Sequence, residues 1–355
     1  MSVAHVNTHT NEAPDEATPR PSSKSLRGVM FGLTGVGLLA SLLLGVPVDE
    51  VMVAVESMGA SMALVLMVAP LWFIANAMSL RSLLGPEAPI ARRELVKTQI
   101  IGDGLSALLP LAGVGGEPFK LGHLSRWAPA GRVSLALVYD RLAHVVSGLL
   151  YLAALMAASA WWLELPAALE WGFVLGAVAL TATGAALMAL TGAALPGATA
   201  WLARRVKLLR HIHEADTRID GQTLARALGY KLLARLAHVP ELWLIAVLMG
   251  LTGDPGQVAL IGAMLTGSTF LFFVVPGGVG VNEAGVAGAF ALLGLPTHLG
   301  VAFGLARRAR VLFWAAVGVT LWAGAGVLHR VFGHLTADLC TTAASAAAPE
   351  TGSQP

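Results

Sequence analysis

The chain has a single cysteine, Cys340, so it can form neither an intrachain disulfide nor a cysteine-based metal site. Charged residues are also scarce, at 12% of 355 residues, whereas soluble domains carry about 25%. The formal net charge of +2 argues against nucleic acid as a partner, which would select a clustered basic surface. Phosphate-binding loops, serine nucleophile elbows and HExxH zinc motifs are missing. These absences predict no cofactor, no metal and no enzymatic activity.

Long apolar segments dominate instead, since 56% of the residues are hydrophobic. Six segments reach the about 20 residues that a spanning helix needs: 27–47, 53–80, 133–157, 172–192, 227–250 and 299–328. Two shorter apolar stretches, near 98–114 and 256–275, end in breaks rich in Pro and Gly. Irregular backbone persists at membrane depth only where protein or water surrounds it. We therefore predict an all-α polytopic membrane protein with about six spanning helices and two re-entrant broken-helix hairpins.

The two breaks match each other. Glu117 and Glu283 each lie seven residues after a proline, and an arginine follows each glutamate by 24 residues, at Arg141 and Arg307. This pattern predicts an internal repeat with cores at about 98–157 and 256–328. Interrupted apolar segments at corresponding positions of two halves point to a transporter's binding site. The residues predicted to break the helices are Pro110, Gly113, Gly115, Pro276, Gly277, Gly278 and Gly280.

Basic residues predict the orientation in the membrane, because they are enriched in cytoplasmic loops. One set of loops carries Lys24, Arg27, Arg81, Arg92, Arg93, Lys97, Lys120, Arg126, Arg132, Arg204, Arg205, Lys207, Arg210 and Arg218. The opposite loops carry Asp49, Glu50, Glu164, Glu170 and Asp254. Both termini are then cytoplasmic. Three predicted spans separate the two breaks, and an odd number inverts the second copy, which predicts an inverted repeat.

The ends of the chain differ from its centre in composition. Residues 1–25 are polar and contain several prolines, which predicts a disordered cytoplasmic arm. Residues 336–355 are rich in Ala, Thr and Ser and are predicted to form a disordered tail. Between them, residues 26–335 form the predicted integral membrane domain.

Glu117 and Glu283 each follow a break, and two roles are open for them. They can line cavities on opposite sides of the membrane, or cap the free N–H groups of the next helix. The two roles are compatible with each other.

Charged residues also occur inside predicted spans: Asp140, Arg141, Arg307, Arg308 and Arg310. Each Arg at the bilayer centre costs about 2.5–3.5 kcal/mol on insertion scales, so these side chains must face protein, water or lipid head groups. They can form internal struts, with Arg307 on Glu283 and Arg141 on Glu117 or Asp140. Alternatively, the guanidinium groups bind a phosphate or another polar lipid head.

One predicted span carries a polar stripe at three- and four-residue steps: Tyr230, Lys231, Arg235, His238 and Glu241. The stripe predicts a surface that lines the pathway. For Lys231 and Arg235, the favoured interpretation is that the side chains snorkel to the cytoplasmic surface.

The second break, Pro276-Gly-Gly-Val-Gly-Val-Asn-Glu283, and the later Arg307-Arg308-Ala309-Arg310 run resemble the lysylphosphatidylglycerol synthase transmembrane, flippase-like family. The first break, Gly113-Val-Gly-Gly-Glu117-Pro-Phe-Lys120, resembles that family's other signature, and the arginine run is similar to hopanoid-biosynthesis-associated members. The resemblance implies a bacterial inner-membrane lipid translocator. It places Glu117, Lys120, Glu283 and Arg307 at the lipid cavities.

Three functions remain open at this stage. The favoured one is a lipid transporter or flippase whose polar side chains receive a lipid head. The others are a membrane enzyme with Glu117 or Glu283 as a general base, and a non-catalytic scaffold that partners lipid-biosynthesis enzymes. Synthase activity is not expected, because this chain lacks the soluble transferase domain of aminoacylating members. The lipid can be a hopanoid, an aminoacylated phospholipid or a polyprenyl-linked sugar.

Overall fold

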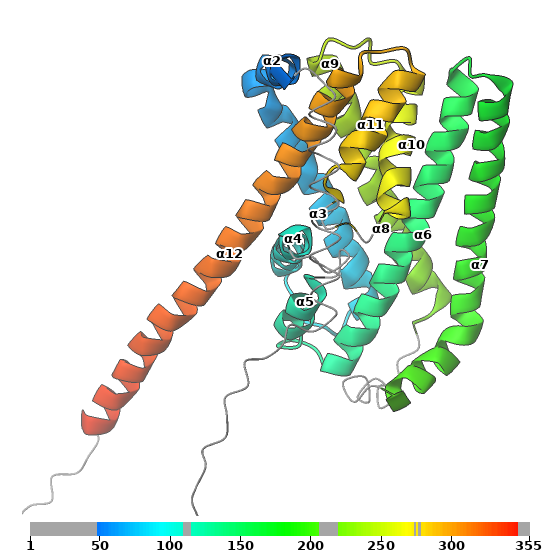
Figure 1. The fold of residues 1–355 in the computed structure, drawn as a ribbon. Coiled ribbons are helices and arrows are strands. Elements are labelled where there is room, and N and C mark those ends of the chain that lie inside the picture. Colours follow the sequence, from blue (N-terminus) through cyan, green and yellow to red (C-terminus); the bar gives the residue numbers. More distant parts are fainter. Residues whose placement is uncertain (1–47, 109–114, 206–218, 273–274, 276–277, 347–355) are drawn as a thin grey trace, which may run out of the picture.

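The structure is a computed structural model that describes residues 48–108, 115–205, 219–272, 275 and 278–346 (Figure 1). Within these ranges every regular element is a helix. The helices are α2 (Val48–Met58), the 3-10 helix η1 (Gly59–Ser61), α3 (Met62–Leu84), α4 (Arg92–Leu108), α5 (Glu117–Leu124), α6 (Ala130–Trp162), α7 (Ala167–Arg205), α8 (Gly221–Leu236), α9 (His238–Leu248), α10 (Pro255–Leu271), α11 (Val281–Leu292) and α12 (Thr297–Ala346).

Some predicted features lie outside the described residues. They are the arm at 1–25, the span at 27–47, the end of the tail at 347–355 and the break residues Pro110, Gly113, Pro276 and Gly277.

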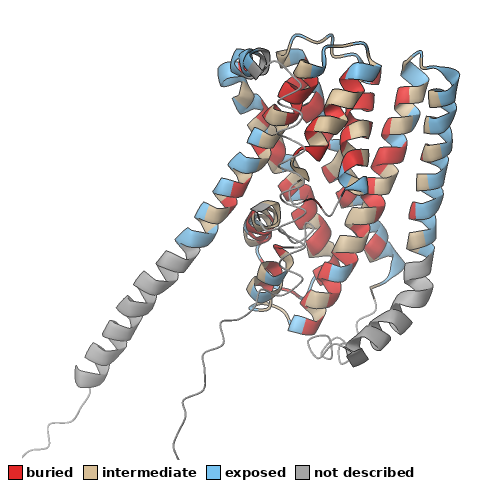
Figure 2. Ribbon diagram, viewed as in Figure 1, coloured by how far each residue is buried: buried red, intermediate tan, exposed pale blue. Residues whose placement is uncertain are grey.

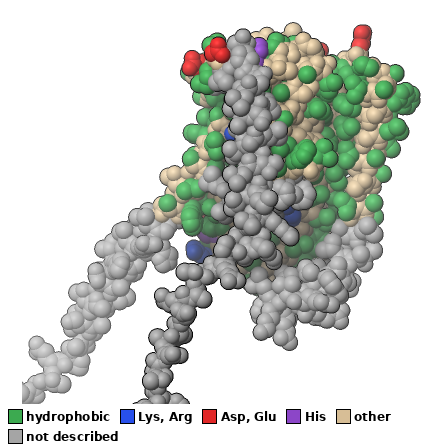
Figure 3. Space-filling view, viewed as in Figure 1, with side chains coloured by type: hydrophobic (Ala, Val, Ile, Leu, Met, Phe, Trp, Pro, Cys, Tyr) green, Lys and Arg blue, Asp and Glu red, His purple; other side chains and the backbone are tan. Residues whose placement is uncertain are grey.

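Within the described ranges, three helical stretches are long and apolar enough to cross a membrane: Glu56–Leu84, Ala130–Trp162 and Ala167–Ala189. Hydrophobic side chains cover much of the flank seen in Figure 3, and acidic side chains lie at its upper end. Figure 2 shows the converse arrangement, with buried residues concentrated on the inner faces of the helices. The predicted all-α membrane-protein fold is confirmed.

The predicted span 227–250 differs from the structure, which divides it into α8 and α9 at Ala237. Pro240 provides the physical reason. It has no N–H to donate to the carbonyl of Leu236, and its ring crowds that carbonyl, so the helix is interrupted there. The interruption places Lys231 and Arg235 on one helix and Glu241 on the next.

The two predicted hairpins appear as helix pairs, α4–α5 and α10–α11. They lie toward opposite ends of the bundle, with α4 and α5 in the lower half of Figure 1 and α10 and α11 in the upper half. The second helix of each pair is short, at 8 residues for α5 and 12 for α11. At 1.5 Å per residue these helices rise roughly 12 and 18 Å, less than the about 30 Å of a bilayer's hydrocarbon core.

Glycines let the first pair close. A Cβ on Gly116 would lie 1.9 Å from the carbonyl oxygen of Gly102, so α4 and the start of α5 meet backbone to backbone. In the second break, Gly278 and Gly280 have φ values of 60° and 77°, the left-handed region that glycine adopts without steric cost. Gly116 therefore satisfies a packing requirement, and Gly278 and Gly280 satisfy backbone requirements.

The hydrophobic core has two main clusters, one around each hairpin. The first joins α3, α4, α6 and α8 through Leu80, Leu95, Val133 and Ala227 among others. The second joins α9, α10, α11 and α12 through Leu242, Ile261, Phe290 and Phe303 among others. Helix α3 contributes to both, with Leu80 in the first cluster and Val65 in the second, and the buried polar residue Asn76 lies between them on the helix.

Candidate functional site

Two adjoining cavities lie in the interior of the bundle. The larger, of about 470 Å³, is here named the arginine chamber for Arg141, Arg235, Arg307 and Arg310 in its wall. The smaller, of about 310 Å³, is named the polar chamber for Glu117, Lys120, Asp140 and Lys231 in its wall. Six residues line both chambers: Trp72, Asp103, Arg141, His144, Thr269 and Asn282. The two spaces therefore share one partition.

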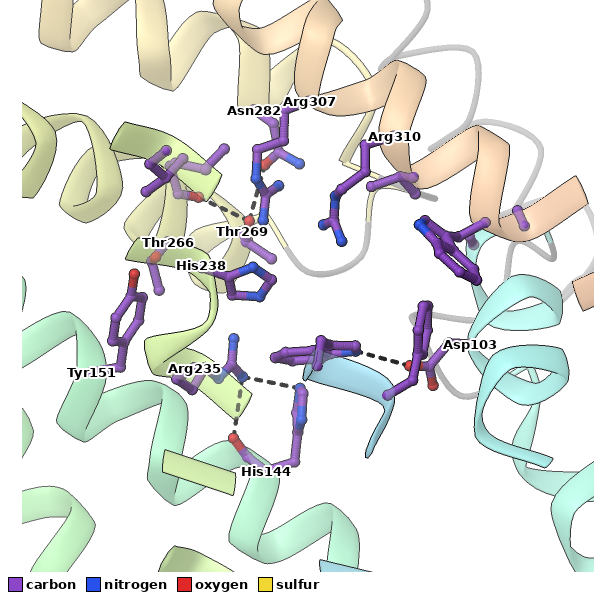
Figure 4. Close-up of a pocket in the computed structure, with 18 of the residues that line it drawn as sticks. Asp103, His144, Tyr151, Arg235, His238, Thr266, Thr269, Asn282, Arg307 and Arg310 are labelled. Atoms are coloured by element: carbon purple, nitrogen blue, oxygen red, sulfur yellow. Dashed lines mark hydrogen bonds between the residues drawn. The ribbon is translucent and has the colours of Figure 1, made fainter. Parts of the chain in front are cut away.

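The three arginines Arg307, Arg308 and Arg310 on α12 point in two different directions. Arg307 and Arg310 lie three residues apart, so they share a face of the helix. Their Nε atoms lie 3.5 and 2.9 Å from Oε1 of Glu241 on α9, a side chain only 1% exposed. On its other oxygen, Glu241 lies 3.0 Å from Nδ1 of His238. This carboxylate holds two arginines and orients a histidine. Figure 4 shows Arg307, Arg310 and His238 at the chamber wall.

Arg308 points the other way, to Glu283 at the start of α11. Its Nε donates to Oε1 of Glu283 at 2.5 Å, and its Nη2 donates to Oε2 at 3.1 Å. One of the two interpretations left open by the sequence, a strut between Arg307 and Glu283, therefore names the wrong arginine, because Arg308 forms the strut. Adjacent helical residues project about 100° apart, so only one of the two can face α11.

Glu283 also caps α11, because its carboxylate accepts the backbone N–H of Gly280 at 2.8 Å. The side chain is fully buried and faces a separate space of about 30 Å³. Its repeat counterpart Glu117, the first residue of α5, instead lines the polar chamber. The two matched glutamates thus begin corresponding helices but have different surroundings.

Arg235 of α8 extends into the arginine chamber. Its Nη2 lies 3.0 Å from Nε2 of His144 and donates to the His144 carbonyl at 3.3 Å. Its guanidinium carbon lies 5.5 Å from the centre of the Trp72 ring. Arginine has no acceptor atom, so Nε2 of His144 must accept and this imidazole is neutral in this arrangement. The predicted snorkelling of Arg235 is wrong.

Trp72 organises the partition between the chambers. Its ring lies 4.6 Å from that of His238 and 5.9 Å from that of His144, and its Nε1 donates to Oδ2 of Asp103 at 3.1 Å. The other Asp103 oxygen accepts from Gln99 at 2.8 Å. The indole therefore links α3 to α4, α6 and α9 at one point.

Lysines provide the cations of the polar chamber. Lys231 Nζ donates to Asp140 and to Asn76, each at 2.8 Å, and Ser79 donates to the second Asp140 oxygen at 2.9 Å. Lys231 is only 2% exposed, so the snorkelling predicted for it is wrong. A buried ammonium needs a counter-ion and acceptors, and α3 and α6 supply them.

A second lysine lies on α5 in the same chamber. Lys120 Nζ lies 3.3 Å from Glu117 and 3.5 Å from Asp103, with its side chain 4% exposed. It connects the start of α5 to α4 across the first hairpin. The chamber therefore contains both signs of charge at close range.

The structure brings most of the predicted site residues to the two chambers. Glu117, Lys120 and Asp140 line the polar chamber, Arg307 and Arg310 line the arginine chamber, and Arg141 lines both. Glu283 and Arg308 line neither, and they lock α11 to α12 instead. Among the described residues, no group of three or more His, Cys, Asp or Glu side chains is arranged to hold a metal ion.

Some chamber residues received no site assignment from the sequence. The 3–4 spacing on residues 230–241 indicated a polar stripe that includes Arg235 and His238, but snorkelling was the favoured interpretation for Arg235 and the partners were not given. Trp72 and Tyr151 lie in apolar segments, where nothing in the local sequence separates them from other core aromatics. Their position depends on the way that α3 and α6 face α8 and α9.

No curated protein and no solved structure matches the chain. A family match does exist, to the family described as "Lysylphosphatidylglycerol synthase TM region", and it extends over residues 28–319. The matched range contains both hairpins and every chamber residue named above. Because it also covers most of the sequence, the chain belongs to this family of lipid-related membrane proteins.

Proposed function

We propose that the protein moves or hands on a polar-headed lipid, of hopanoid or phospholipid type, in a bacterial inner membrane. One observation carries the proposal: two adjoining, charge-lined chambers lie inside a bundle whose flank is apolar. Ionisable side chains are costly in a membrane and typically face a substrate or ion pathway. Apolar side chains also line the larger chamber, which suits an amphiphile.

The hairpin arrangement supports a transport mechanism. The pairs α4–α5 and α10–α11 lie toward opposite ends of the bundle, as inverted repeats require. In this mechanism each hairpin serves one leaflet, and the lipid head passes the shared partition at Trp72 while its tail stays in the bilayer. Both chain ends are cytoplasmic in this proposal, as the basic loops predict.

The test is transbilayer movement of fluorescent lipid in proteoliposomes containing the full chain. Glu117→Gln and Arg307→Gln each remove one chamber charge, and Arg93→Gln is the matched control because its side chain is 84% exposed. Loss of a charge-assisted contact worth about 1.5–3 kcal/mol is expected to slow movement at least about tenfold in the two chamber variants. Unchanged rates in both would refute the mechanism.

A different outcome would favour the other function open from the sequence. Wild-type proteoliposomes that move no lipid, together with stable co-purification of lipid- or glycolipid-biosynthesis enzymes, would indicate a non-catalytic component of a biosynthetic complex. Substitutions of the chamber charges would then leave those associations intact.

A further inference from the structure

Positive charge exceeds negative charge on one wall of the arginine chamber. In the part of the chain that the structure describes, Glu241 is the carboxylate within 4.0 Å of Arg307 and Arg310. None of the described carboxylates lies that close to Arg235, whose nearest polar neighbour is the neutral His144. Three guanidinium groups are therefore matched by one nearby carboxylate, Glu241, which contacts only two of them. An uncompensated cation inside a membrane protein is unfavourable, which indicates that an anion completes the site.

Unused hydrogen-bonding atoms surround the same space. The Nε of Arg235 and the hydroxyl of Tyr151 are buried and form no hydrogen bond with the described residues. The Nε atoms of Arg307 and Arg310 lie 3.5 and 2.9 Å from Glu241, but outside hydrogen-bond geometry. Figure 4 shows these side chains converging from α6, α8 and α12 around His238. Buried polar atoms in native proteins are normally satisfied, so a cluster of unsatisfied donors around one hollow indicates a ligand with several acceptors.

The donor set suits a tetrahedral oxyanion. Guanidinium groups bind phosphate and carboxylate oxygens through paired N–H donors. A carboxylate has two oxygens, whereas three arginines and a phenol approaching from three helices call for more acceptors and more than one direction. We propose, building on the lipid function above, that the arginine chamber binds the phosphate of a lipid head group through Arg235, Arg307 and Arg310.

The remaining lining favours a lipid over a free ion. The chamber of about 470 Å³ is far larger than a phosphate needs, and apolar side chains fill much of its wall: Phe73, Leu242, Leu265, Phe270, Val311 and Trp314. Acyl chain or glycerol carbons would contact these groups while the phosphate meets the arginines. An uncharged polyol head would leave the guanidinium charges uncompensated, so the proposal narrows the lipid class to phosphate-bearing lipids.

Binding of short-chain lipids to the purified full chain in detergent tests this inference by calorimetry. The probes are dihexanoyl phosphatidylglycerol, dihexanoylglycerol, which lacks the phosphate, and inorganic phosphate. We expect the phospholipid to bind most tightly. Arg235→Gln and Arg310→Gln should each weaken it at least about tenfold, and Arg93→Gln should leave it unchanged. Arg235→Lys, which keeps the charge, should recover part of the affinity. Thermal unfolding of each variant verifies folding.

Each contrary result has a definite meaning. Equal binding of dihexanoylglycerol, or unchanged affinity in folded Arg235→Gln and Arg310→Gln, overturns the phosphate site. If inorganic phosphate binds as tightly as the phospholipid, the claim that the bound phosphate belongs to a lipid is refuted. Arginine-dependent phospholipid binding without transbilayer movement leaves this inference standing and refutes the transport function. Lipid movement that is unchanged in Arg235→Gln and Arg310→Gln refutes this inference and leaves the transport function standing.

Discussion

Replacing Glu283 by Gln removes the carboxylate that holds the second hairpin to α12. Both oxygens are engaged, since Oε1 accepts from Nε of Arg308 at 2.5 Å and Oε2 accepts from Nη2 of Arg308 and from Gly280. The glutamine amide would turn a second donor toward the guanidinium. The substitution therefore exchanges a charge-assisted double hydrogen bond for one neutral bond and one repulsive contact.

The expected cost follows from the burial of the pair. The Glu283 side chain is 1% exposed and that of Arg308 is 18% exposed. Loss of one partner from a buried ion pair costs about 3–5 kcal/mol, and the partial exposure of Arg308 places this case near the lower end, at about 3 kcal/mol. The Glu94–Lys97 pair provides a matched control. Its N–O distance is 3.1 Å, but the two side chains are 26% and 51% exposed, so Glu94→Gln should cost no more than about 1 kcal/mol.

The measurement is the free energy of unfolding in mixed micelles, followed by far-UV circular dichroism for wild type, Glu283→Gln and Glu94→Gln. If the two variants differ by less than about 1 kcal/mol, Glu283 is not the strut that the structure indicates. Arg308→Met combined with Glu283→Gln should recover much of the loss, because the double variant leaves no buried charge.

Two further substitutions test the packing of the first hairpin and the polar chamber. Gly116→Ala would place a Cβ 1.9 Å from the Gly102 carbonyl oxygen, and we expect a loss of at least about 3 kcal/mol in thermal unfolding. Gly122→Ala on the same helix meets nothing within 4 Å and should stabilise by up to about 1 kcal/mol, so equal effects of the two would contradict the close approach. Lys231→Met leaves buried Asp140 without its cation and should cost about 3–5 kcal/mol in chemical unfolding. Adding Asp140→Asn should restore most of that loss, and no recovery would mean that the pair is not coupled.

The sequence predicted the class of the fold because that class depends on local composition. Apolar segments such as 133–157 and 172–192 indicate helices in a membrane whatever their neighbours are, and the structure contains them as α6 and α7. The breaks near Glu117 and Glu283 were also visible, since proline and glycine act on their own backbone. The interruption at Ala237 was missed even though Pro240 marks it.

Side-chain partners were predicted less well. Repetition along the chain paired Arg307 with Glu283, yet Arg307 lies with Arg310 on Glu241 and Arg308 takes Glu283. Lys231 was expected at the surface because a lysine near the end of a lone helix would extend there. In the protein, Asn76 and Asp140 from two other helices surround it.

The sequence alone determined that this protein is an all-helical membrane protein with two matched interruptions and with ionisable groups inside its apolar segments. Those properties depend only on the residues within each local segment of the chain. Only the tertiary structure decided that Arg235, Arg307 and Arg310 share a chamber and that Glu283 is a strut. Successive residues of a helix point about 100° apart, so neighbouring arginines meet different partners. The packing of helices that are distant in the sequence decides which face of each helix turns inward.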